Sequence, residues 1–225
     1  MNAIDVLIKY WGYTGFRLKQ EEIIQKVIKK EDILALLPTG GGKSICYQIP
    51  ALMNEGICLV ISPLISLMNE QSKHLQSKGI KSEFINSSMH HSEIDTILTN
   101  CIYGGVKFLY LSPEKLQNRL VQNRITEMNI NLITVDEAHC ISEWGHNFRP
   151  AYRHVAKIRS ILSQAPILAL TATATSDVTN DIQENLLFKK KNLIKSSFIR
   201  RNMSYVIEKK KDKKSRLLRL LNKVK

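Results

Sequence analysis

The chain has 225 residues, of which 44% are hydrophobic and 24% charged, so it is long enough for one large domain with a hydrophobic core. Its uncharged apolar runs are far too short to cross a bilayer, and Asp5 and Lys9 interrupt the first apolar stretch, which argues against a signal peptide. The four cysteines are scattered without a C-x-x-C pair, which argues against a zinc site or a disulfide framework and favours a reduced, cytosolic protein.

The net charge of +13 is concentrated at one end of the chain. Residues 189–225 contain 15 Lys or Arg and only two acidic residues, whereas the preceding 188 residues contain 18 basic and 18 acidic side chains. A basic tail can bind phosphates, but Lys-rich stretches are often merely solvated. Both interpretations remain open, so charge alone does not establish nucleic-acid binding.

Short β-branched runs recur along the chain and predict strands at residues 33–37, 57–61, 83–85, 107–111, 132–135 and 167–170. Several runs are apolar on both faces, as in buried parallel strands. Helix-like stretches lie between them, for example at 64–78 and 92–101. This alternation predicts an α/β fold in which helices cover both faces of a central, mostly parallel sheet.

The last part of the chain has a different pattern. Residues 192–198 predict one more strand, 209–214 a charged linker, and 215–224 the start of a leucine-rich helix. No further segment is left to cover the apolar face of this helix. We therefore expect one domain at 1–205, followed at 206–225 by a basic linker and the start of a second domain whose remainder is missing.

The strongest local motif spans residues 37–44 and directly follows an apolar strand. Its three glycines, Gly40, Gly41 and Gly42, leave backbone N–H groups free to wrap a phosphate chain next to Thr39. Lys43 would reach the β- and γ-phosphates of ATP, and Ser44 would ligate Mg²⁺. Leu37 replaces the usual first glycine of this motif, and a glycine-rich turn without a ligand is the alternative.

Asp136, Glu137 and His139 follow a second apolar strand. Because the carboxyl ends of parallel strands meet at one edge, these residues can face the glycine loop. Asp136 would hold Mg²⁺ and Glu137 would polarise the attacking water, since phosphoryl transfer depends on positioning and charge neutralisation. A simple helix N-cap is the alternative for the two acids. Together, the two motifs predict a P-loop NTPase.

Residues 170–175 form a threonine-rich segment after the apolar run at 167–169. Small hydroxyl side chains there could couple the nucleotide site to a partner domain. The alternative is that the segment is an ordinary strand end.

These motifs together resemble the RecQ helicases of superfamily 2. Residues 16–20, preceded by Tyr13, are similar to that family's motif 0, residues 62–68 to motif Ia, and residues 111–116 to motif Ib. The resemblance implies a RecA-like domain in which Gln20 reads the adenine edge and Tyr13 and Arg17 flank the ring. It also implies that motif Ia contacts the DNA backbone. The acidic motif at 136–139 and the threonine-rich segment match the family's motifs II and III, and the resemblance implies that His139 links the nucleotide site to motif III or to the DNA loop.

Residues 140–150 resemble the aromatic-rich loop with which RecQ helicases sense single-stranded DNA. The loop contains Trp144, His146, Phe148 and Arg149, which the resemblance assigns to DNA binding. Aromatic side chains in a polar stretch next to an arginine can stack on bases. The alternative is that both aromatic side chains fill the core beneath a loop.

We therefore expect the ATP-binding first motor domain of a 3′-to-5′ RecQ-type DNA helicase that acts in recombination and repair. ATP and Mg²⁺ are the expected cofactors. The expected partners are single-stranded or partially duplex DNA and a second RecA-like domain in cis. No membrane association is expected, and the location would be cytoplasmic, or nucleoid-associated in a bacterium. Because the family's arginine finger lies in the second domain, the isolated chain should be weakly active or inactive. The alternatives are a superfamily 2 RNA helicase domain and a non-catalytic ATP- and DNA-binding module.

Overall fold

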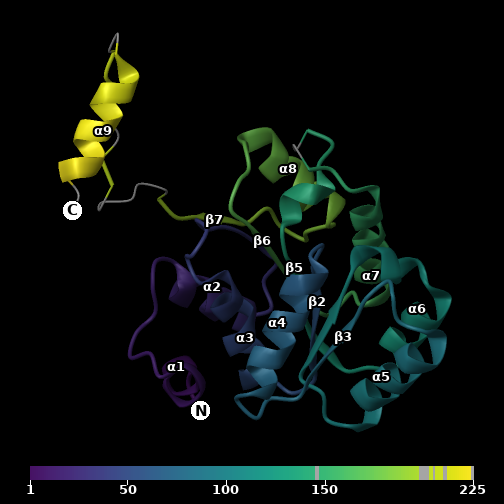
Figure 1. Cartoon of the computed structure of the whole chain (residues 1–225). Helices are drawn as coiled ribbons and strands as arrows, with labels where there is room; N and C mark the ends of the chain where they lie inside the picture. The colour runs from purple at the N-terminus through teal and green to yellow at the C-terminus, as the bar shows by residue number, and fades with distance from the viewer. Residues whose placement is uncertain (145–146, 198–202, 205, 210–211, 224–225) are drawn as a thin grey trace.

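One parallel sheet forms the centre of the computed structural model, which describes the chain except residues 145–146, 198–202, 205, 210–211 and 224–225. Within the described residues, seven strands pair in the order β3-β4-β2-β5-β6-β1-β7, and every pair is parallel (Figure 1). The strands are β1 (Ile33–Leu36), β2 (Ile57–Ile61), β3 (Ser82–Ile85), β4 (Phe108–Leu111), β5 (Ile130–Val135), β6 (Ile167–Thr171) and β7 (Leu193–Lys195). The predicted α/β sheet is confirmed.

Helices cover both faces of this sheet, as the sequence predicts. One core cluster joins the sheet to α5 (His91–Tyr103), α6 (Arg119–Thr126), α7 (His154–Ile161) and α8 (Ser176–Asn185). The other joins it to α2 (Gln20–Ile28), α3 (Lys43–Met53) and α4 (Ile65–Gln76). Short 3-10 helices occupy Pro113–Gln117, Ala138–Ile141 and Pro150–Arg153.

The first helix, α1 (Ala3–Trp11), packs outside α3 and has clear start and stop signals. The Asn2 side chain accepts a hydrogen bond from the Asp5 N–H at 2.9 Å, and the Asp5 carboxylate accepts one from the Asn2 N–H at 3.1 Å. This reciprocal capping satisfies N–H groups that the helix itself cannot. At the other end, Gly12 adopts a left-handed φ of 72° and ends the helix.

The sheet order brings three of the predicted motifs to one edge. Strands β5, β6 and β1 are neighbours, with Val135 paired to Ala169 and Leu36 paired to Thr171. Their carboxyl ends therefore carry the acidic motif, the threonine-rich segment and the glycine loop side by side.

Two features of the C-terminal part differ in extent from the sequence prediction. The strand predicted at 192–198 is only three residues long in β7, which is an edge strand and pairs with β1 alone. Residue 198 of the prediction lies outside the described residues. The leucine-rich helix is α9 (Lys213–Lys223), and Leu217, Leu218, Leu220 and Leu221 on it are exposed. Among the described residues, no helix is long and apolar enough to cross a membrane.

A buried ion pair ties the sheet to α7. The Asp32 carboxylate accepts hydrogen bonds from Arg159 at 2.9 Å, from the Ile167 N–H at 2.9 Å and from the Lys189 N–H at 3.1 Å. Both charged side chains are almost fully buried, at 3% and 5% exposure. Removing one partner of such a pair leaves an uncompensated buried charge.

We therefore predict that Asp32→Ala lowers the free energy of unfolding by about 3–5 kcal/mol, measured by urea denaturation. Glu184→Ala is the matched control, because it breaks an exposed ion pair with Lys191 and should change stability little. Equal, small effects of the two substitutions would contradict a structural role for the buried pair.

Candidate nucleotide and nucleic-acid site

The glycine loop at residues 37–44 connects β1 to α3, and its conformation requires glycine at specific positions. Gly40 and Gly42 have positive φ values of 77° and 72°. A Cβ on Gly41 would lie 2.8 Å from the Pro38 carbonyl oxygen, and one on Gly42 would lie 2.3 Å from Nε2 of Gln20. Any other residue would strain the backbone at Gly40 and Gly42, and at Gly41 its Cβ would clash with the Pro38 carbonyl oxygen.

The N-terminus of α3 opens into the same loop. The helix begins at Lys43, and no side chain caps it at Gly42. Uncapped N–H groups and the positive end of the helix dipole make such a terminus an anion site. Such a loop and helix end suit a phosphate chain, and phosphate binding by Thr39, Gly40, Gly41, Gly42, Lys43 and Ser44 stays a prediction.

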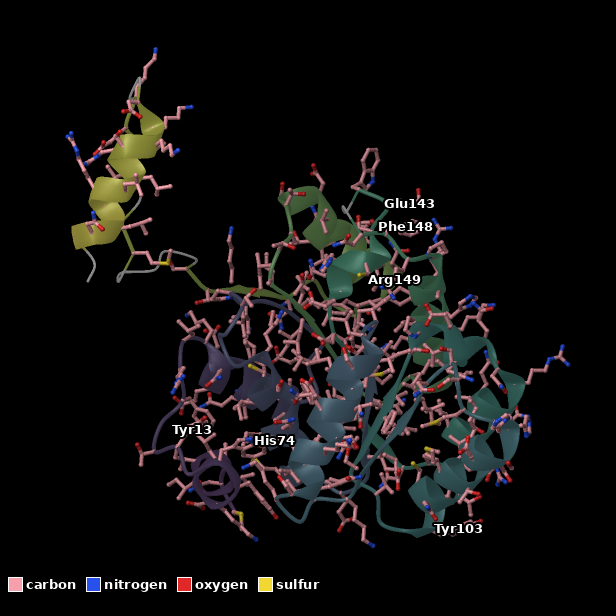
Figure 2. The ribbon with its side chains drawn as sticks, in the orientation of Figure 1. Tyr13, His74, Tyr103, Glu143, Phe148 and Arg149 are labelled. Carbon is pink, nitrogen blue, oxygen red and sulfur yellow. The ribbon has the colours of Figure 1, made fainter. Side chains whose placement is uncertain are left out.

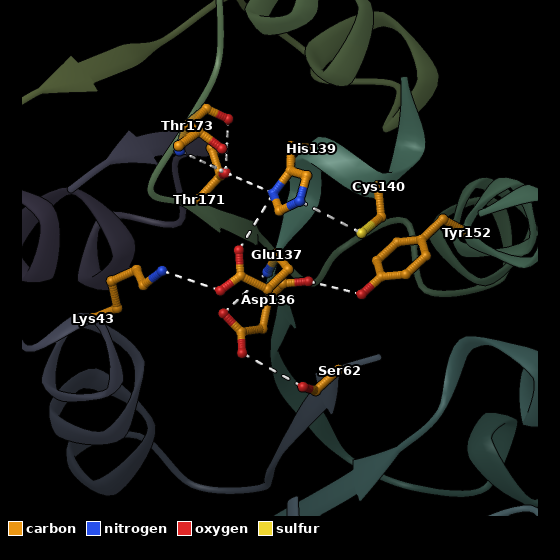
Figure 3. A network of polar contacts seen from close by, with 9 residues as sticks. All are labelled: Lys43, Ser62, Asp136, Glu137, His139, Cys140, Tyr152, Thr171 and Thr173. Atoms are coloured by element: carbon orange, nitrogen blue, oxygen red, sulfur yellow. Dashed lines mark hydrogen bonds and ion pairs between the residues drawn. The ribbon is translucent and has the colours of Figure 1, made fainter. Parts of the chain in front are cut away.

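Lys43 meets the acidic motif across the edge of the sheet, as Figure 3 shows. Its Nζ lies 3.3 Å from Oε1 of Glu137. The neighbouring Asp136 carboxylate accepts a hydrogen bond from the Ser62 hydroxyl at 3.4 Å. The two motifs therefore face each other across one site.

The two acids differ in their electrostatic surroundings. Burial and the neighbouring Glu137 carboxylate raise the pKa of Asp136, although Lys43 opposes this shift. The hydrogen bond from His139 lowers the pKa of Glu137 against the effect of partial burial, and Lys43 adds to the lowering. Glu137 therefore stays ionised at neutral pH and can accept a hydrogen bond from water.

His139 bridges the acidic motif and the threonine-rich segment. Its Nδ1 lies 3.3 Å from Oε2 of Glu137 and 3.0 Å from Oγ1 of Thr171, while its Nε2 lies 3.8 Å from the Cys140 sulfur. The Cys140 sulfur and the Glu137 carboxylate raise the pKa of His139 to about 9, against the effect of partial burial. The ring is therefore an imidazolium at neutral pH and donates from Nδ1 to both neighbours.

An open cleft of about 260 Å³ extends from the glycine loop towards α1. Tyr13 and Arg17 line it, with the guanidinium carbon 5.3 Å from the centre of the tyrosine ring. Gln20 also lines it, but its side-chain amide donates to the carbonyl oxygens of Gly41 and Gly42 at 3.2 and 3.0 Å, and its Oε1 accepts the Arg17 N–H at 2.8 Å. Gln20 therefore braces the loop.

The aromatic-rich loop leaves the same edge of the sheet. Trp144 is 80% exposed, so it does not fill the core. Phe148 is half-buried, and the guanidinium carbon of Arg153 lies over its ring, 5.3 Å from the ring centre. Arg149 donates to the Pro63 carbonyl oxygen at 3.2 Å and so joins this loop to the segment before α4. Figure 2 shows Phe148 and Arg149 at one end of the molecule and Tyr103 at the other. His146 lies outside the described residues.

Some residues at the site have no sequence signal of their own. Gln71 and His74 of α4 line the cleft opposite Tyr13, and the Tyr152 hydroxyl donates to the Asp136 carbonyl oxygen at 2.9 Å. The spacing of apolar residues in α4 predicts a helix at 64–78, and only the packing of that helix brings these side chains to the site.

A glycine loop facing an acidic strand end across a parallel sheet defines a P-loop nucleotide-binding domain. The chain belongs to the DEAD/DEAH box helicase family, whose model matches residues 17–182.

Proteins similar to this chain include ATP-dependent DNA helicases named RecQ. The RecQ of Pasteurella multocida is 42% identical over 208 residues, which are 92% of this chain and 33% of that protein. The RecQ of Bacillus subtilis is 43% identical over 213 residues, or 94% of this chain and 36% of that protein. The resemblance found in the motifs is confirmed, and the chain spans about a third of the length of these relatives. A mimivirus relative whose name mentions an RNA helicase is 44% identical over 195 residues, 86% of this chain and 35% of that protein.

Solved helicase structures share the fold. The helicase MrfA bound to DNA has a TM-score of 0.69 at 17% identity, over 87% of this chain and 29% of that one. The Hef helicase domain of Pyrococcus furiosus has a TM-score of 0.60 at 22% identity, over 80% of this chain and 38% of that one.

Proposed function

We propose that the chain is the ATP-binding motor domain of a RecQ-type DNA helicase that unwinds DNA in the 3′-to-5′ direction during recombination and repair. The contact between Lys43 of the glycine loop and Glu137 of the acidic motif carries the ATP-hydrolysing part of this proposal, because a lysine that would bind phosphate lies 3.3 Å from a carboxylate that would orient water. The nucleotide use of the family and the RecQ similarity support it.

In this proposal, ATP lies across the glycine loop. Its phosphates accept hydrogen bonds from the N–H groups of residues 40 and 42–44, whereas the Gly41 N–H donates to the Pro38 carbonyl oxygen. Lys43 leaves Glu137 and forms an ion pair with the phosphates. The adenine enters the cleft beside Tyr13 and Arg17, with Gln20 turning from the loop carbonyls to the base edge. Glu137 then orients the attacking water, and His139 keeps that carboxylate ionised.

Ser44 and Asp136 are the residues that would hold Mg²⁺. Their oxygens suit a hard cation, and both side chains line one cleft of about 90 Å³ together with Ser62 and Glu137. When bound, the ion would neutralise the negative charge of the phosphates. Among the described residues, no cluster of three or more His, Cys, Asp or Glu side chains could hold a metal by itself, so the phosphates would complete this site.

Single-stranded DNA is the proposed partner of the aromatic-rich loop. We predict that Trp144→Ala weakens binding of a single-stranded oligonucleotide by about 5- to 150-fold, because base stacking on an aromatic side chain contributes about 1–3 kcal/mol. Fluorescence anisotropy at fixed salt measures this change. Tyr103→Ala is the control, because Tyr103 is 79% exposed but far from the loop (Figure 2). Equal affinities of the two variants would contradict the assignment of Trp144.

The remaining assignments belong to the same proposal. Residues 1–205 would form the ATP-binding domain and 206–225 the linker and start of a second RecA-like domain, an interpretation supported by the exposed leucines of α9. That domain would work in cis, and the location would be the cytoplasm or a bacterial nucleoid. RNA-stimulated hydrolysis would favour the RNA helicase alternative, and binding without turnover in the longer protein would favour a non-catalytic module.

A further inference from the structure

Tyr152 contacts the acidic motif from the opposite side to Lys43. It lies in the 3-10 helix at Pro150–Arg153, is 1% exposed, and donates its hydroxyl to the main-chain carbonyl oxygen of Asp136 at 2.9 Å (Figure 3). Because a main-chain carbonyl oxygen can only accept, the Tyr152 hydroxyl is the donor in this contact.

The peptide bond between Asp136 and Glu137 is held at both ends. Its carbonyl oxygen accepts the Tyr152 hydroxyl, and its N–H donates to Oδ1 of Asp136 at 3.0 Å. Glu137 has φ 47° and ψ 46°, the left-handed region that costs an L-residue other than glycine free energy. Such a conformation persists only where its surroundings fix it.

The left-handed turn determines where the Glu137 carboxylate points. Its two oxygens each lie 3.3 Å from a cation, Oε1 from Nζ of Lys43 and Oε2 from Nδ1 of His139. A rotation of the preceding peptide would swing the carboxylate out of this position.

We propose that Tyr152 is a positioning residue, which holds the Asp136–Glu137 peptide through its carbonyl oxygen and thereby keeps the Glu137 carboxylate aimed into the nucleotide site. The role in hydrolysis rests on the proposed function, whereas the role in holding the peptide does not.

The test uses Tyr152→Phe in the whole chain, which keeps the ring and removes the hydroxyl. NMR first measures the Cα shift and the HN–Hα coupling of Glu137. We expect the Cα shift and the coupling of Glu137 to move away from the values typical of a left-handed residue. Unchanged values would overturn the proposal, whatever the enzymatic activity of the chain.

The second readout is ATP hydrolysis with single-stranded DNA. We expect Tyr152→Phe to lower kcat by about 10- to 100-fold, because a misplaced Glu137 carboxylate would orient the attacking water poorly. The KM for ATP should stay within about twofold of the wild-type value. Ser72→Ala is the matched control, since it removes a buried hydroxyl that donates to the Ser82 carbonyl oxygen at 3.2 Å, between α4 and β3. An equal loss of kcat in the control would overturn the positioning role. Failure of the wild-type chain to bind ATP would count against the proposed function, whereas absence of turnover would not, because an isolated first domain lacks the arginine finger. In both cases the NMR result would still decide the role of Tyr152.

Discussion

Replacing Lys43 with alanine is expected to lower the affinity for Mg-ATP by about 10- to 150-fold, because the substitution removes a charge-assisted contact to the phosphates worth about 1.5–3 kcal/mol. It also removes one of the two cations that lie 3.3 Å from the Glu137 carboxylate, so the repulsion between the acidic motif and the phosphates would increase. Titration with a fluorescent ATP analogue measures the affinity.

Lys73→Ala is the control for this experiment. Lys73 is an exposed lysine of α4, so the substitution removes the same charge from the chain away from the glycine loop. If Lys43→Ala bound nucleotide as tightly as this control, the assignment of the phosphate loop would be wrong.

The second large effect is expected for Glu137→Gln, which keeps the size of the side chain and removes its charge. The amide can no longer act as a carboxylate towards the attacking water, so kcat should fall by about 10²- to 10⁴-fold. The affinity for ATP should be retained, because Lys43 and the backbone of the loop remain. Single-turnover hydrolysis, with protein in excess over ATP and with single-stranded DNA present, measures the rate even where turnover is slow.

Glu70→Gln is the corresponding control, an exposed glutamate on α4 that should leave the rate unchanged. A Glu137→Gln variant that hydrolysed ATP at the wild-type rate would remove Glu137 from the mechanism. A variant that lost nucleotide binding instead would assign the residue to ligand binding.

The fold could be predicted because its signals are local. Strands buried on both faces appear in the sequence as continuous apolar runs, and the run at 57–61 coincides with β2. The motif residues could be placed because each motif directly follows such a strand, and parallel strands end at one edge. Even the exposure of Trp144 follows from its polar neighbours in the sequence.

The contacts that hold the site in shape could not be predicted, because they join residues far apart in the sequence. Gln20 reaches the carbonyl oxygens of Gly41 and Gly42, and Arg159 reaches Asp32 across 127 positions. Neither contact leaves a periodic pattern. The left-handed conformation of Glu137 is also invisible in the sequence, because glutamate has no preference for it.

The most direct test of the proposed function is the rate of ATP hydrolysis by this chain under single-turnover conditions, without nucleic acid, with single-stranded DNA and with RNA of the same sequence. We expect bound ATP, slow hydrolysis, and a rate that DNA raises more than RNA does. Stimulation by RNA and not by DNA would contradict a DNA motor, and failure to bind ATP under any of these conditions would contradict the nucleotide site itself.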